Sequence, residues 1–267
     1  MVNEKLRTYL EELLSQISIQ EIEHQKIYTS VVVIKERLEK YFENDGLKEI
    51  RVFGSFDRGT LLSRDIDEES DVDILVVFNE QKWESQTYLN KFKQFAEAYY
   101  SRSEIFQDHP TIALKLGHIK FELVPCRYNR TFWGNDEFFI PLKKDGEVEW
   151  IETDPDYLKE KISEYEGEAN QMLINLILLF KYWNLKIGFQ YDSFQVEKYS
   201  LKNFYKSYHL EENFLNFIDY LNYSNPKQSQ NDANKIAKIS HKKIDILLDN
   251  DMVDYALLEI KKILPEP

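Results

Sequence analysis

The chain has 267 residues, 43% of them hydrophobic and 14% aromatic, which is enough for a substantial core in one or two domains. Its single cysteine, Cys126, excludes an internal disulfide. Because the sequence shows neither a signal-peptide core nor an apolar run of membrane-spanning length, we expect a soluble, cytoplasmic protein without a membrane partner. The 34 basic and 47 acidic residues give a net charge of −13, which argues against a large nucleic-acid partner.

Two apolar stripes with helical spacing predict a long N-terminal helix over residues 3–43. The stripes consist of Leu6, Leu10, Leu13, Leu14 and Ile17, and of Ile27, Val31, Ile34, Leu38, Tyr41 and Phe42. The Asn-Asp-Gly sequence at 44–46 is a typical helix stop, and a strand is predicted over 48–53.

The middle of the chain has the pattern of strands separated by turns, with one helix. An apolar strand is predicted over 71–78, and a helix from Ser85, as its N-cap, to about residue 100. The alternating stretch TIALKLGHIKFELVPC predicts a β-hairpin that turns at Gly117. A second hairpin is predicted across KKDG (143–146), where it joins EFFIPL to VEWIE.

Beyond Pro155 the pattern is almost entirely helical. Gly188 is predicted to end the helix that contains LILLFKYWN, and the polar stretch 224–232 is predicted to be a connection. The order is therefore helix, then mixed helix and strand, then helix only. We place two domains at residues 1–160 and 161–267.

Two carboxylates stand at the start of the apolar strand ILVVF. In a strand, Asp71 and Asp73 point to the same face, roughly 7 Å apart. A third, Glu122 in IKFELVP, would face them at roughly 5 Å if the two strands were neighbours. Three carboxylates so placed repel one another unless cations intervene. Mg²⁺ fits best, since it takes carboxylates, water and substrate phosphates, and two such ions about 4 Å apart serve phosphoryl or nucleotidyl transfer.

The Gly54-Ser55 break upstream strengthens this interpretation. Glycine lets a phosphate approach the backbone, and a helix beginning at Ser55 would direct amides toward it. Asp65 and Asp67 form a competing pair, but no strand follows them, so the pair at 71 and 73 is favoured. The alternative is that the acids merely solvate the start of a strand.

The order and spacing of these motifs resemble a known family. Gly54-Ser55, Asp71-Val72-Asp73 leading a strand, and an acid in FELVP are similar to the nucleotidyltransferase fold of the DNA polymerase β superfamily. The stretches HPTIALKLGHIKFELVPC, WIETDP, LLFKYWN and DSFQVE narrow the resemblance to the bacterial CD-NTases, relatives of cyclic GMP–AMP synthase and oligoadenylate synthase. The resemblance covers roughly residues 45–200. It implies an α+β fold with two lobes, a palm with a mixed β-sheet and a long N-terminal helix, and an all-α C-terminal lobe that binds substrate.

The resemblance also implies a role for each matching residue. Asp71 and Asp73 would bind two Mg²⁺ ions, for which Mn²⁺ can substitute, and Glu122 would bind one metal and help activate the attacking ribose hydroxyl. The donor triphosphate would be contacted by Gly54, Ser55, Lys181 and Ser193. Phe194 would stack on the donor base.

Two features depart from the family pattern. The third acid is usually Asp, whereas here it is Glu122, whose extra methylene moves the carboxylate outward. Fifteen residues separate Ser55 from Asp71, more than is usual, and the acidic turn RDIDEES lengthens the loop between them.

The activity implied is the joining of nucleoside triphosphates into a cyclic di- or trinucleotide, with release of pyrophosphate. Such products are second messengers in anti-phage defence and activate a separate downstream effector. Two alternatives stay open: an enzyme that extends RNA, such as tRNA 3′ ends, which the acidic charge disfavours, and an inactive sensor that binds nucleoside triphosphates, which Glu122 leaves open. For Lys181 the alternative is a lysine that reaches solvent from an apolar helix, and for Phe194 it is a place in the core.

Overall fold

The computed structural model describes residues 4–79, 83–108, 111–144, 147–204, 209–219, 221 and 228–267. The chain divides into two compact units. We call Ile19–Tyr157 the sheet unit, and Met1–Ser18 together with Leu158–Pro267 the helical unit. The division differs from the one expected at residue 160 in that the first helix groups with the C-terminal helices.

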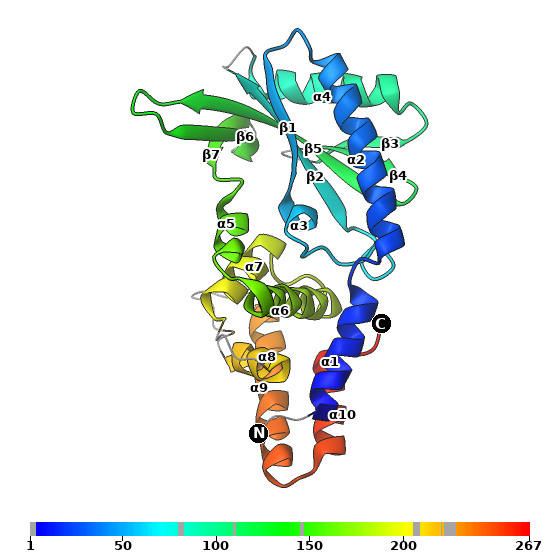
Figure 1. Ribbon diagram of the computed structural model, residues 1–267, viewed down its shortest axis with the longest axis vertical. Helices are drawn as coiled ribbons and strands as arrows, with labels where there is room; N and C mark the ends of the chain where they lie inside the picture. Colours follow the sequence, from blue (N-terminus) through cyan, green and yellow to red (C-terminus); the bar gives the residue numbers. More distant parts are fainter. Residues whose placement is uncertain are drawn as a thin grey trace. The chain divides into compact units, whose positions relative to one another are not determined.

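The sheet unit is built on one mixed sheet (Figure 1). Its strands are β1 (Leu47–Phe53), β2 (Asp71–Asn79), β3 (Glu104–Asp108), β4 (Thr111–Leu116), β5 (Ile119–Arg130), β6 (Asp136–Lys144) and β7 (Glu147–Thr153). The order is β1-β2-β5-β4-β3, and β6 pairs with both β5 and β7. Central β2 runs antiparallel to β1 and parallel to β5, so the starts of β2 and β5 lie side by side.

Both predicted hairpins form as strand pairs. β4 and β5 pair antiparallel around the turn at Gly117, and β6 and β7 pair antiparallel. The turn residues Asp145 and Gly146 of the second hairpin lie outside the described residues. Strand β3 was not predicted, because its five residues are too short for alternation to be evident.

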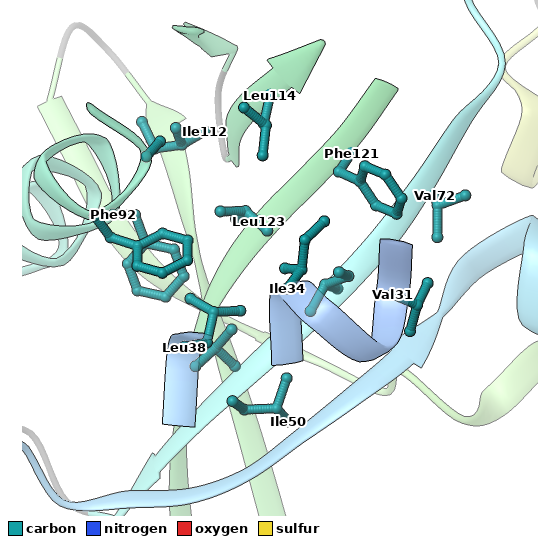
Figure 2. Close-up of a cluster of buried hydrophobic side chains, with 14 of the residues drawn as sticks. Val31, Ile34, Leu38, Ile50, Val72, Phe92, Ile112, Leu114, Phe121 and Leu123 are labelled. Atoms are coloured by element: carbon teal, nitrogen blue, oxygen red, sulfur yellow. The ribbon is translucent and has the colours of Figure 1, made fainter. Parts of the chain in front are cut away.

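Helices α2 (Glu21–Tyr41) and α4 (Ser85–Tyr99) cover one face of this sheet. Alternation along β2 directs Val72, Ile74, Val76 and Phe78 to that face, where they are fully buried. Figure 2 shows this core, with side chains from α2, α4 and the strands packed together.

On the opposite face of the sheet, the side chains of β2 and β5 are charged at the start of the strands and apolar further along. Its later part carries a small buried cluster of Leu75, Val77, Val124 and Cys126. Since side chains alternate, the same face at the start of the two strands carries the acidic residues.

One detail of α4 corrects the prediction. Glu84, rather than Ser85, is the N-cap, and its side chain makes no capping hydrogen bond. Instead, the hydroxyl of buried Ser85 donates a 2.6 Å hydrogen bond to the carbonyl of Val148 on β7. The Ser85 hydroxyl, which could have capped the helix locally, is therefore used in a tertiary contact with β7.

The two N-terminal stripes lie on two separate helices. Helix α1 (Glu4–Ile17) ends before Ser18, and α2 begins at Glu21. The first stripe is buried where α1 contacts α6, α8 and α10 of the helical unit. The second stripe is buried against the sheet. A single helix over residues 3–43 is therefore corrected to two, because the stripes belong to different cores.

The rest of the helical unit confirms the all-helical prediction. Its helices are α5 (Tyr157–Ser163), α6 (Gly167–Lys186), α7 (Ser193–Lys202), α8 (Leu210–Asp219), α9 (Gln228–Asp249) and α10 (Val253–Ile263). Gly188 follows the end of α6 with φ of +78°, as a residue that stops a helix should. Of the expected connection 224–232, the first part lies outside the described residues and 228–232 is helical.

Candidate active site

The starts of β2 and β5 bring the predicted carboxylates together. In the parallel register, Asp73 lies directly opposite Glu122. The neighbouring pair on the same face, two residues earlier, is Asp71 and Lys120. The expectation that Glu122 faces the aspartate pair is confirmed, because hydrogen bonding between the two strands fixes which side chains are neighbours.

Gly54 closes over this group from the end of β1. It begins the short helix α3 (Gly54–Asp57) with φ of +75°, a conformation that disfavours residues with a Cβ. A Cβ built on it would lie 1.9 Å from Oδ2 of Asp73. Gly54 is therefore required twice, once for the backbone turn and once to leave room for the Asp73 carboxylate.

Ser55 is the second residue of α3. Its carbonyl accepts a 2.9 Å hydrogen bond from the amide of Thr60, which closes the turn after the helix. Gly54 and Ser55 thus lie in a tight turn whose first residue touches the carboxylate cluster.

A residue that the sequence interpretation missed, Lys120, is bonded to two of the acids. Its Nζ lies 3.0 Å from Oδ2 of Asp71 and 2.9 Å from Oε1 of Glu122. The Lys120 side chain is only 8% exposed. A signal was present, since Lys120 precedes Glu122 by two residues and must share its strand face.

The pKa values of Glu122 and Lys120 are both shifted by burial and by neighbouring charges. Burial, followed by the charge of Asp71, raises the pKa of Glu122, although Lys120 opposes this. Burial lowers the pKa of Lys120, but the carboxylates of Asp71 and Glu122 outweigh that effect, so its pKa is raised overall. The cluster thus holds a firmly protonated lysine beside a carboxyl that resists ionisation.

The competing pair at 65 and 67 does not lie on a strand. Asp65 is exposed on a turn, and Asp67 accepts a 3.1 Å hydrogen bond from the amide of Glu69. Burial raises the pKa of Asp67, and the nearby charge of Asp71 adds to this. Asp67 is therefore a fourth acid near the cluster, without the strand support that Asp71 and Asp73 have.

The cluster matches a divalent cation by donor type. Carboxylate oxygens are the donors that Mg²⁺ prefers. Because Gly54 has no Cβ, the Asp73 carboxylate has room beside the turn. Among the residues that the structure describes, however, no three His, Cys, Asp or Glu side chains converge to hold one ion. Asp71 and Glu122 are instead bonded to the Lys120 ammonium.

The other predicted residues form a second group in the helical unit. Lys181 on α6 is 8% exposed and lies 2.5 Å from Oε1 of Glu197 on α7, whose side chain is 1% exposed. Burial contradicts the alternative of a lysine that reaches solvent. Ser193 begins α7 one turn before Glu197, so the two share a helix face. Phe194 is 50% exposed, which contradicts its place in the core.

The start of α7 is held by Asp192. Its carboxylate accepts hydrogen bonds from the amides of Phe194 and Gln195 and so caps the helix. Glu197 was quoted in the DSFQVE motif, but nothing in the sequence indicated its pairing with Lys181. The structure thus assembles Gly54, Asp71, Asp73 and Glu122 in the sheet unit, and Lys181 near the start of α7 in the helical unit.

Comparison with protein families gives one match over more than half of the chain. The Second Messenger Oligonucleotide or Dinucleotide Synthetase domain matches residues 5–165. This range includes the whole carboxylate cluster. No curated protein sequence gives a significant match. Within the described residues, no helix is long and apolar enough to cross a membrane.

Solved structures show the same fold over nearly the whole chain. Escherichia coli MS115-1 CdnC with ATP has a TM-score of 0.74 at 15% identity, covering 96% of both chains. The same protein in complex with HORMA-deltaN has a TM-score of 0.73 at 16% identity, covering 98% of this chain and 96% of that chain. Vibrio cholerae DncV cyclic AMP-GMP synthase, in complex with the linear intermediate 5′ pppA(3′,5′)pG, has a TM-score of 0.74 at 11% identity, covering 95% and 92%.

At these identities the structural likeness establishes the fold, and the domain match establishes the family. The carboxylates at the start of two parallel strands, closed over by a glycine turn, are the part of this fold that the sequence had singled out. The chain belongs to the Second Messenger Oligonucleotide or Dinucleotide Synthetase domain family and is a nucleotidyltransferase of the CD-NTase type.

Proposed function

We propose that this chain joins nucleoside triphosphates into a cyclic di- or trinucleotide in a Mg²⁺-dependent reaction that releases pyrophosphate. The observation that carries the proposal is the register of β2 and β5, which places Asp73 opposite Glu122 on the face that also carries Asp71. Carboxylates grouped in this way suit an active site that handles phosphates through a divalent cation.

Each residue of the sheet unit has a proposed task. Asp71, Asp73 and Glu122 would hold the metal. When bound, Mg²⁺ would neutralise charge that develops on the phosphate oxygens. Glu122 would also help to activate the attacking ribose hydroxyl, as a carboxylate beside the reacting group can. The turn of Gly54 and Ser55 would hold the triphosphate close to these acids.

In the helical unit, we assign the donor nucleotide to Lys181, Ser193 and Phe194. Glu197 holds the Lys181 ammonium in place, which would fix it for contact with a triphosphate. The half-exposed ring of Phe194 is accessible for stacking on a base. The structure of CdnC contains ATP, and that of DncV contains a linear dinucleotide intermediate, which supports nucleoside triphosphates as substrates here.

The product would act as a second messenger in anti-phage defence and reach a separate effector in the cytoplasm. CdnC forms a complex with a HORMA protein, which supports a search for a protein partner of this chain as well. The base identities, ring size and linkage of the product are properties that product analysis would supply.

The test is incubation with the four nucleoside triphosphates and Mg²⁺, followed by pyrophosphate measurement and mass spectrometry of the products. Asp71→Asn/Asp73→Asn should abolish pyrophosphate release. The matched control is Asp65→Asn/Asp67→Asn, which removes two carboxylates from the nearby turn and should keep most of the activity. Full activity in the first variant, or loss only in the second, would contradict the assignment. Activity that appears only when tRNA is added would support the RNA-extending alternative.

An inactive nucleotide sensor is the second candidate, and one observation favours it. Among the described residues, no three acidic side chains are placed to hold one ion, and the Lys120 ammonium is bonded to Asp71 and Glu122. A sensor would bind nucleoside triphosphates without releasing pyrophosphate, and Glu122→Gln would change nothing. The enzyme predicts that Glu122→Gln loses about two orders of magnitude in rate, a typical loss for one general-base contact, while Glu122→Asp keeps measurable activity.

A further inference from the structure

Lys120 occupies a position that the proposed metal site would also require. Its Nζ is within 3.0 Å of an oxygen of both Asp71 and Glu122, and its side chain is 8% exposed. The two acids come from different strands, so this one ammonium ties β2 to β5 at the start of both.

An ammonium and a divalent ion compete for these two carboxylates. Mg²⁺ takes its ligands at about 2.0–2.1 Å, so an ion on Asp71 and Glu122 would lie within the contact distance of the Lys120 ammonium. Two positive charges so close in a partly buried site repel strongly. Binding of a metal ion to this pair of acids is therefore disfavoured while the Lys120 ammonium stays bonded to them.

The surroundings explain why a resident cation is present. The cluster gathers Asp71, Asp73 and Glu122 on one face, with Asp67 near enough to interact with Asp71. Partly buried carboxylates without a counter-charge destabilise a fold. Lys120 supplies that counter-charge from within the chain, two residues before one of the acids.

We propose that Lys120 is the resident counter-cation of this site: it holds Asp71 and Glu122 in the metal-free protein, and a divalent cation must displace its ammonium from them to bind. The metal affinity of the site is then set by Lys120 as well as by the acids. This inference deepens the proposed function and rests on its metal site.

The experiment is a Mn²⁺ titration followed by electron paramagnetic resonance, which counts free ions and needs no turnover. Lys120→Met should tighten Mn²⁺ binding by about tenfold or more, since it removes the competitor and leaves the acids. It should also lower the melting temperature of the metal-free protein, and added Mn²⁺ should restore it. Lys120→Arg, which keeps the charge, should bind Mn²⁺ as the parent does.

Lys115→Met is the matched control. Lys115 lies directly opposite Lys120 across β4 and β5, and its Nζ is 5.5 Å from the centre of the Phe106 ring. Removing this neighbouring charge should change Mn²⁺ binding less than twofold, whereas a change as large as that of Lys120→Met would point to a general charge effect and reject the proposal. If Lys120→Met fails to fold, Lys120→Gln, which keeps a hydrogen-bond donor, should show the same tightening.

The outcomes separate this inference from the proposed function. Unchanged or weaker Mn²⁺ binding in Lys120→Met overturns the inference. If the parent at the same time binds Mn²⁺ through Asp71 and Asp73 and releases pyrophosphate, the proposed function stands alone. Absence of Mn²⁺ binding in the parent and in Lys120→Met contradicts both.

Discussion

At the scale of single residues, the site depends on a glycine, Gly54. Gly54 combines a positive φ with a contact to the Asp73 carboxylate that leaves no space for a Cβ. The carboxylate position is thus set by the turn after β1 as well as by β2 itself. A substitution here should disturb the chemistry more than the fold.

We predict that Gly54→Ala lowers pyrophosphate release by about two orders of magnitude, because the new methyl group displaces Asp73. Gly59→Ala is the matched control, since Gly59 has φ of +70° but a methyl group added there would meet no atom within 4 Å. Both variants should lose about 1–3 kcal/mol of stability from backbone strain alone. Equal activity losses in the two variants would show that strain, rather than Asp73, accounts for the effect.

At the scale of elements, α6 and α7 are joined by a buried ion pair. Lys181 and Glu197 are both nearly inaccessible to solvent, so each neutralises a charge that would otherwise be buried with less compensation. The pair therefore has a structural task, and nucleotide binding by Lys181 must be measured separately from it.

Lys181→Met and Glu197→Met should each destabilise the helical unit by about 3–5 kcal/mol, because each leaves a partner charge buried. The double variant should recover much of that stability, measured by urea unfolding followed by circular dichroism. It should still bind nucleoside triphosphates more weakly than the parent if Lys181 contacts the triphosphate. Parent-like binding by the double variant would leave Lys181 with the structural task alone.

At the scale of the whole molecule, the chain leaves the helical unit after α1 and returns to it at Leu158. The first helix packs against α6, α8 and α10, which follow it by more than 140 residues. In the sequence, the sheet unit is thus inserted between α1 and the other helices of the helical unit. Each unit has a separate core.

Two leucines of the N-terminal segment should report on different units. Leu10 on α1 and Leu38 on α2 are both fully buried, and each Leu→Ala change should cost about 2–5 kcal/mol. Leu10→Ala should speed amide hydrogen exchange in α6, α8 and α10, and Leu38→Ala should speed it in β2 and α4. Identical exchange patterns in the two variants would contradict the division into two cores.

What the sequence determined by itself were features with a local physical cause. The period of two in a strand places Asp71 and Asp73 on one face, and Gly188 supplies the positive φ that ends α6. Such rules act within a few residues, so they predicted most strands, both hairpins and the helical C-terminal half.

Only the tertiary structure decided which distant groups meet. The partners of Lys120 follow from the pairing of β2 with β5, and Ser85 donates to Val148 instead of capping α4 because β7 lies beside it. Likewise, the helical spacing of the two N-terminal apolar stripes does not indicate that α1 packs in one core and α2 in another. These outcomes depend on packing between segments far apart in the chain, where hydrogen-bond register and burial, rather than local propensity, select the partner.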